Sequence, residues 1–206
     1  MTTSATEAGR RGRSEKKRLA ILDAARDLFM ADGYELTSVD AIAARAAVSK
    51  RTVYDHFGDK ERIHLAVVER AAEKVLVTVQ TALEEELPRG CDIRAGLLSF
   101  ARRVATETFP SSAYVQFRLL NTRGAGPRRV PGSMRNAPRE LFTQRIEDFA
   151  AEGVLRAEQP RRAAEHFVAL TLLLAQDTLD PSLTGAWDEV DQILVDGVDA
   201  FLRAYT

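Results

Sequence analysis

The sequence predicts an all-α protein. Apolar residues recur at the three- and four-residue spacing of amphipathic helices along most of its 206 residues. No segment shows the apolar–polar alternation of a strand, and Ser, Asp, Pro and Gly stand where helix ends are expected. Apolar residues make up 45% of the chain, which is enough for a packed core. No apolar run is long enough to span a membrane, so we expect a cytoplasmic protein without a membrane partner.

The first residues differ from the rest in composition. Residues 1–13 are small, polar and basic, and we expect a disordered arm there. Between Arg10 and Arg18, six basic side chains stand against the single acid Glu15, although the whole chain has a formal net charge of −1. Such a local excess attracts phosphates, but a solvated tail can have the same composition. Both interpretations stay open at this point.

Three helices are predicted between residues 14 and 58. In the first, Ile21, Ala25 and Phe29 fall on one helical face. Ser14 is a good N-cap for this helix, and Gly33, which can adopt a positive φ, ends it.

The second and third helices are short and separated by a tight turn. The second begins at the capping box TSVD, residues 37–40, in which the aspartate replaces the usual Glu or Gln. Ser49 caps the third, which runs to His56 and turns Val53 and Phe57 inward. Two short helices joined in this way form a helix-turn-helix, whose second helix enters the major groove of DNA.

The third helix leaves basic and hydroxyl side chains on its outer face, namely Lys50, Arg51, Thr52, Tyr54 and His56. Arg51 or Lys50 can donate to guanine O6 and N7, and Thr52 can contact a base or a phosphate. Tyr54 and His56 have the reach for phosphate oxygens. Residues 14–58 therefore predict a DNA-binding domain, and residues 59–206 a second helical domain.

The stretch from Ile21 to Val68, ILDAARDLFMADGYELTSVDAIAARAAVSKRTVYDHFGDKERIHLAVV, resembles the DNA-binding domain of the TetR family of regulators. Its most specific part is the segment VSKRTVYDHFGDKE. The resemblance implies DNA contacts from Thr37, Ser38, Lys50, Arg51, Thr52, Tyr54, His56 and Lys60. The chain departs from the family at Ala47, where glycine is usual. If this turn needs a positive φ, alanine costs about 1 kcal/mol there.

Further helices are predicted after Gly58. They cover residues 60–88, with Asp59 as the cap, and residues 92–108, 112–123, 138–151, 160–179 and 187–205. Pro138 suits the first turn of its helix. Residues 124–137 are rich in Gly, Pro and Arg, and we expect a long, mobile loop there.

The TetR resemblance implies that the last two helices pack against a partner copy. The candidate interface residues are Phe167, Leu170, Leu174, Val190, Leu194, Val198 and Phe201. These residues form one apolar stripe on each of the two helices. The alternative is that both stripes are buried inside one subunit. The end of the chain is also similar to the AefR-like subgroup of the family.

The resemblance also implies a ligand pocket among the central helices. The apolar candidates for its lining are Phe100, Val104, Phe117, Leu120, Phe142, Ile146, Phe149 and Leu173, and the polar ones are Arg118, Asn121 and Gln176. Core packing is the alternative for the apolar set, and surface exposure for the polar set. We expect a homodimeric transcriptional regulator that binds double-stranded operator DNA. A small, largely apolar ligand, whose identity the sequence does not give, would release this repressor from its operator.

An enzyme and a helical adaptor protein are the two alternatives to a regulator. An enzyme is not expected, because the three histidines form no HExxH motif and no GxSxG motif or phosphate-binding loop is present. No cofactor or metal is expected, since the single cysteine, Cys91, excludes an internal disulfide and a multi-thiolate site. A redox role for Cys91 near a helix start is an alternative to inert packing. A helical adaptor that binds only protein would not need the basic face of the third helix.

Overall fold

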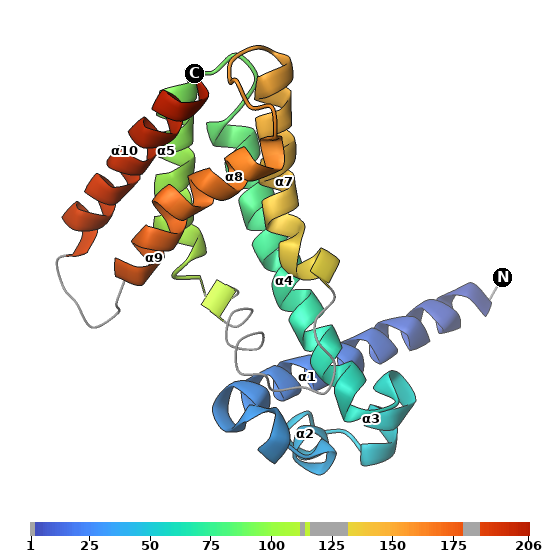
Figure 1. The fold of residues 1–206 in the computed structure, drawn as a ribbon. Helices are drawn as coiled ribbons and strands as arrows, with labels where there is room; N and C mark the ends of the chain where they lie inside the picture. The colour runs from blue at the N-terminus through green and yellow to red at the C-terminus, as the bar shows by residue number, and fades with distance from the viewer. Residues whose placement is uncertain (1–2, 112–113, 116–131, 179–185) are drawn as a thin grey trace. The chain divides into compact units, whose positions relative to one another are not determined.

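The computed structural model describes residues 3–111, 114–115, 132–178 and 186–206. Every regular element among them is helical, as predicted (Figure 1). The elements are α1 (Thr3–Leu36), α2 (Val39–Arg45), α3 (Lys50–Phe57), α4 (Lys60–Glu86), α5 (Ile93–Arg103), η1 (Val104–Thr108), α7 (Gly132–Ala151), α8 (Pro160–Val168), η2 (Ala169–Leu173), α9 (Leu174–Thr178) and α10 (Ala186–Tyr205). None of the described helices has a stretch long and apolar enough to cross a membrane.

The chain divides into two compact units, which we describe separately. Among the described residues, the first unit extends to Ala72, and the second begins at Glu73, within α4. The boundary therefore lies later than the division at residue 58 that the sequence suggested.

The core of the first unit is formed by the inner faces of its short helices and of α1. Ile21, Ala25 and Phe29 of α1 are each at most 4% exposed. Ile42 of α2 and Val53 of α3 are at most 1% exposed. These are the positions that the helical spacing predicted, and their burial leaves the opposite face of α3 in solvent.

The N-terminal arm is helical rather than disordered. α1 begins at Thr3, so Ser14 lies inside the helix and does not cap it. Residues 3–13 contain no proline and several good helix formers, and a helix that is already packed further along extends over such residues at low cost. The regular part of α1 ends where expected, because Gly33 has a non-helical φ of 82°.

Local caps fix the starts of α2 and α4. Ser38, and not Thr37, is the N-cap of α2, and its Oγ accepts from the Ala41 N–H at 3.0 Å. Asp59 accepts from the Arg62 N–H at 2.7 Å at the start of α4, as predicted. Ala47 has a φ of 53°, so the turn before α3 does adopt the left-handed conformation that favours glycine.

Aromatic rings fill the centre of the second unit. The Phe100 and Phe142 rings are stacked at 5.2 Å between centroids. Phe167 contacts Phe142 at 4.8 Å and Phe201 at 5.4 Å. The rings come from α5, α7, α8 and α10, so this cluster joins four helices of the unit.

The predicted start of one helix of this unit needs correction. α7 begins at Gly132 instead of Pro138, so residues 132–137 are helical and not part of a loop. Proline inside a helix removes one backbone donor without preventing a turn before it. Residues 116–131 lie outside the described residues, and with them most of the helix predicted at 112–123.

The helix predicted at 160–179 is present with a change of winding. It consists of α8, the π-helical turn η2 and α9. α10 crosses η2 closely at Gly197, where a Cβ would clash with the carbonyl oxygen of Leu170. Charged pairs hold the other side of α10: Arg94 and Arg102 of α5 each make a bidentate pair with a carboxylate, Asp199 and Asp191 respectively.

Candidate nucleic-acid interface

The helix α3 is fixed at both ends. Ser49 Oγ accepts from the Thr52 N–H at 3.1 Å and caps its start. At its end Gly58 has a φ of 83°, and its N–H donates to the Tyr54 carbonyl at 2.8 Å. Phe57 and Val53 anchor the inner side. Such a short helix depends on these contacts rather than on its own propensity, so the caps also set the direction of its outer face.

Two side chains on the outer face of α3 are available to DNA. The Arg51 side chain is 91% exposed, and its ion pair with Asp55 is long, at 3.9 Å. Tyr54 is 44% exposed. An exposed guanidinium can donate two parallel hydrogen bonds to a guanine edge, and a phenol can donate to a phosphate.

Lys50 connects α3 to α2. Its Nζ donates to Asp40 Oδ2 at 2.9 Å, and this hydrogen bond raises the pKa of the Lys50 ammonium. Both side chains are more than half exposed, at 51% and 68%. An ion pair in such contact with water is weak, so a phosphate can compete with Asp40 for the ammonium.

The remaining polar residues of the predicted site are partly engaged. Thr52 Oγ1 lies 2.9 Å from Ser49 Oγ, and Ser38 caps α2 while remaining exposed. The His56 ring is half-buried, with its centroid 6.3 Å from that of Phe57. Of these three side chains, only that of Ser38 is hydrogen-bonded to the backbone among the described residues.

Two predicted contacts are placed differently by the structure. Thr37 is 2% exposed and its Oγ1 donates to the Gly33 carbonyl at 2.7 Å, so its hydroxyl is not at the surface. Lys60 Nζ donates to the Tyr34 and Thr37 carbonyls at 2.9 and 3.1 Å. Sequence spacing could not reveal this role, because these acceptors are backbone atoms more than twenty residues away.

Two further side chains support the site and were not predicted. The Arg18 guanidinium lies 5.3 Å from the centroid of the Phe57 ring. His64 is 5% exposed, packs edge-on against Phe29 and Tyr34, and has no hydrogen-bond partner at Nε2 in the described structure. Burial, with the charge of Lys60 as a second cause, lowers the pKa of His64.

Most described candidates for the ligand site are core residues. Phe100, Val104, Phe142, Ile146 and Phe149 are each at most 4% exposed, and Leu173 is 47% exposed. Gln176 is half-buried and its Nε2 donates to the Tyr114 hydroxyl at 2.8 Å. Four candidates, Phe117, Arg118, Leu120 and Asn121, lie outside the described residues.

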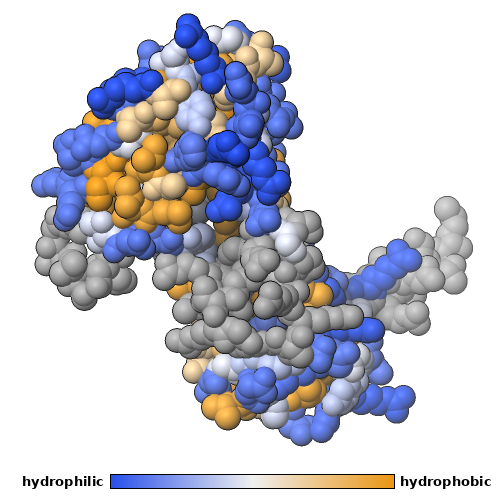
Figure 2. Space-filling view, viewed as in Figure 1, coloured by the Kyte–Doolittle hydropathy of each residue, from blue (hydrophilic) through white to orange (hydrophobic). Residues whose placement is uncertain are grey.

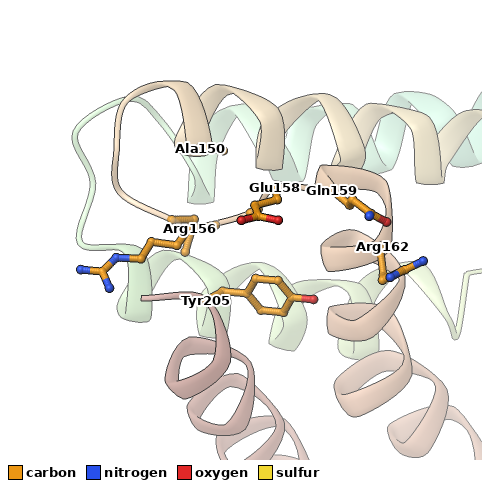
Figure 3. A pocket seen from close by; sticks show the side chains of 8 residues that line it. Ala150, Arg156, Glu158, Gln159, Arg162 and Tyr205 are labelled. Carbon is orange, nitrogen blue, oxygen red and sulfur yellow. The ribbon is translucent and has the colours of Figure 1, made fainter.

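A pocket opens elsewhere in the second unit. It has a volume of about 470 Å³ and is lined by the charged Arg156, Glu158 and Arg162 together with residues that include Leu155 and Ala157. Figure 3 shows the side chains of its lining residues. Tyr205 forms one wall, and its hydroxyl lies 2.7 Å from His166 Nδ1. None of the predicted ligand residues that the structure describes lines this pocket.

The predicted dimer residues fall into two groups. Five are buried inside the chain itself, at most 1% exposed: Phe167, Val190, Leu194, Val198 and Phe201. Their burial is the alternative that the sequence left open, and the helices that carry them pack mainly on α7, η2 and α5. Leu170 and Leu174 are 37% and 50% exposed. Leu173 and Trp187 are also exposed, at 47% and 49%. Figure 2 shows hydrophobic residues gathered at the surface in the region of α9 and α10.

Cys91 is half-buried, next to the start of α5. Burial raises the pKa of its thiol, so the protein stabilises the protonated form and not a reactive thiolate. The structure therefore favours packing over a redox role.

The comparisons with known proteins agree with this geometry. Residues 21–67 match the model of bacterial regulatory proteins of the tetR family, and residues 96–206 match the model of the AefR-like transcriptional repressor C-terminal domain. The HTH-type transcriptional activator FasR of Mycolicibacterium smegmatis is 34% identical over 92 residues, which are 45% of this chain and 42% of FasR. The chain thus matches less than half the length of that relative.

Longer matches are more distant in sequence. The HTH-type transcriptional regulator YhgD of Bacillus subtilis is 25% identical over 78% of this chain and 82% of its own length. A TetR-family crystal structure from Mesorhizobium loti shares the fold with a TM-score of 0.76 and 24% identity, over 94% of this chain and 98% of that one. The AefR-like model alone covers more than half of the sequence. The chain therefore belongs to the TetR family of DNA-binding transcriptional regulators, which are not enzymes.

Proposed function

We propose that this protein is a homodimeric repressor that leaves its operator when a small, largely apolar ligand binds. The observation that carries the DNA-binding part is the outer face of α3, where a capped and anchored helix holds Arg51 91% exposed. A dimer would place its two α3 helices in successive major grooves, about 34–36 Å apart. In this proposal Arg51 reads a base, and Lys50, Tyr54 and His56 contact phosphates.

The dimer proposal rests on the apolar surface of the second unit. Leu170, Leu173, Leu174 and Trp187 are each between 37% and 50% exposed. Exposed leucines on consecutive turns of η2 and α9 are costly in water, and a second copy of the same surface would cover them. Of the interface residues predicted from the sequence, the proposal keeps Leu170 and Leu174, which are not buried within the subunit.

The ligand would bind inside the second unit. Aromatic side chains fill the centre of this unit, and the hydrogen bond from Gln176 to Tyr114 adds polar groups in the same unit. α4 is continuous from the first unit into the second, so repacking around its second half is a means of altering the first unit. The ligand can act only through a difference in its affinity for the two states.

Repression is the simpler direction of regulation. A bound regulator blocks polymerase without further contacts, and the matched C-terminal model describes a repressor. FasR, which is named an activator, supports the opposite direction. The proposal includes a cytoplasmic location, because a DNA-binding regulator needs access to the chromosome.

Selection of bound duplexes from a random DNA pool tests the proposal. We expect an inverted repeat whose half-sites are centred about 10–10.5 base pairs apart or a multiple of this, and an affinity that falls steeply with salt. Recovery of no common sequence would favour the adaptor alternative. Candidate apolar ligands would then be tested for release of the selected DNA, and a ligand that binds without changing DNA affinity would contradict the sensor role.

A further inference from the structure

The N-terminal end of α1 carries a dense positive charge. Residues 11–18, which we call the basic segment, contain Arg11, Arg13, Lys16, Lys17 and Arg18 against the single acid Glu15, a net charge of 5 − 1 = +4. Residues 11–17 are all exposed. Because the segment is helical, these charges are held at fixed spacing instead of on a flexible arm.

The C-terminal end of the basic segment lies next to the C-terminal end of α3, the recognition helix of the proposed function. Arg18, its last residue, lies over the ring of Phe57, and Phe57 is the last residue of α3. From there the segment extends beyond α2 and α3 in the first unit (Figure 1). At a rise of about 1.5 Å per residue, Arg11 lies roughly 10 Å further along the α1 axis than Arg18.

Two acids further along α1, Asp23 and Asp27, pair with arginines outside this segment. Asp23 pairs with Arg26 and Arg70, and Asp27 pairs with Arg26 and Arg45. Within the described part of the chain, Arg11, Lys16 and Lys17 form no ion pair with a carboxylate. The segment therefore offers its charge to a partner with densely spaced negative groups.

DNA beside the recognition helix has this property. Each strand carries a phosphate about every 3.4 Å, so a segment of roughly 10 Å corresponds to about three base pairs. We propose that the basic segment binds phosphates of the duplex flanking each half-site and lengthens the footprint by about three base pairs at each end. This inference rests on the proposed function, since it needs an operator bound through α3.

Charge neutralisation at matched positions tests the inference. One full-length variant carries Arg11→Gln, Lys16→Gln and Lys17→Gln, which keeps good helix formers in α1. The control carries Arg139→Gln, Arg156→Gln and Arg162→Gln, which removes the same charge from exposed residues of the second unit. Both variants are titrated with the selected operator over a range of salt concentrations.

The segment variant should lose about 0.9 in the slope of log K against log salt for each phosphate contact, hence up to about 2.7, while the control keeps the parent slope. A shortened duplex lacking the flanking three base pairs should weaken the parent to the level of the variant and leave the variant nearly unchanged. Equal slopes for the parent and the segment variant would overturn the inference. If the parent binds no DNA, the proposed function itself fails.

Discussion

The Lys60 ammonium donates to the Tyr34 carbonyl at 2.9 Å and lies 4.1 Å from the centroid of the Tyr34 ring. A second hydrogen bond joins the ammonium to the Thr37 carbonyl at 3.1 Å. The first turn of α4 thereby satisfies the backbone where α1 ends and α2 begins. A residue that family resemblance assigns to DNA thus also holds the helix-turn-helix together.

Lys60→Met should destabilise the first unit. The variant keeps a long apolar stem but leaves both carbonyl oxygens without their charged donor, so we expect a loss of about 1–3 kcal/mol in the free energy of unfolding. Hydrogen exchange of α1 and α2 amides measures this locally. Unchanged protection together with a smaller salt slope of DNA binding would assign Lys60 to phosphate contact instead.

His64 should make the first unit sensitive to mild acid. Its folded-state pKa is lowered from 6.5 by burial and by the Lys60 charge, so the unfolded state binds the extra proton first. Stability is therefore full above about pH 6.5 and falls as the pH drops from 6.5 toward the lower folded pKa. His64→Phe should remove this dependence and also the unpaired Nε2.

The measurement is the stability of the first unit between pH 7 and 5, by hydrogen exchange. His166→Gln is the control, since His166 is exposed and lies in the second unit. A parent protein whose first unit is equally stable at both ends of this range would contradict the assignment.

Gly197→Ala should disrupt the crossing of α10 over η2. Its Cβ would clash with the Leu170 carbonyl oxygen, a backbone atom that cannot rotate away. We expect a loss of about 1–3 kcal/mol by overpacking, read as a lower midpoint in urea for the second unit. Asp196→Ala, at the exposed neighbouring position, should change the midpoint little. Equal midpoints for parent and Gly197→Ala would mean that the helices do not approach so closely.

Leu174→Glu should convert the proposed dimer to a monomer. A charge in the centre of an apolar interface loses its hydration, whereas in the isolated subunit Leu174 is 50% exposed and the change costs little. Sedimentation measures the assembly. Val77→Glu, at a 62% exposed valine of α4, is the matched control. A Leu174→Glu protein that sediments like the parent would place the interface elsewhere.

Features that depend on neighbouring residues, such as helix caps, are predicted well from the sequence. Which apolar face of a helix is buried in the subunit is predicted poorly. The caps at Ser49 and Asp59 depend on neighbours within three residues, and both are confirmed. The cap of α2 lies one residue from the predicted start, because Thr37 turns its hydroxyl back to Gly33. Such a shift depends on how α1 ends, which spacing alone does not specify.

The apolar stripes of the last helices are not predicted correctly in this respect, because their burial depends on distant residues. Phe167 and Leu174 lie in one continuous helical run, yet the first is buried in the subunit and the second is exposed. Both faces of this run are apolar, and the π-helical turn η2 shifts the phase between them. The packing of α7 and α10 against this run decides which face is covered.

The central claim is that α3 recognises the operator sequence. The most direct test is how much Arg51→Ala reduces the preference for operator over random DNA. Affinities of the parent and the variant are measured for the selected operator and for random duplex at one salt concentration. The account predicts that the variant loses about 1–3 kcal/mol of binding free energy on the operator and much less on random DNA, because the exposed guanidinium reads a base. An equal loss on both duplexes, or no loss on either, would contradict a recognition role for α3 through this residue.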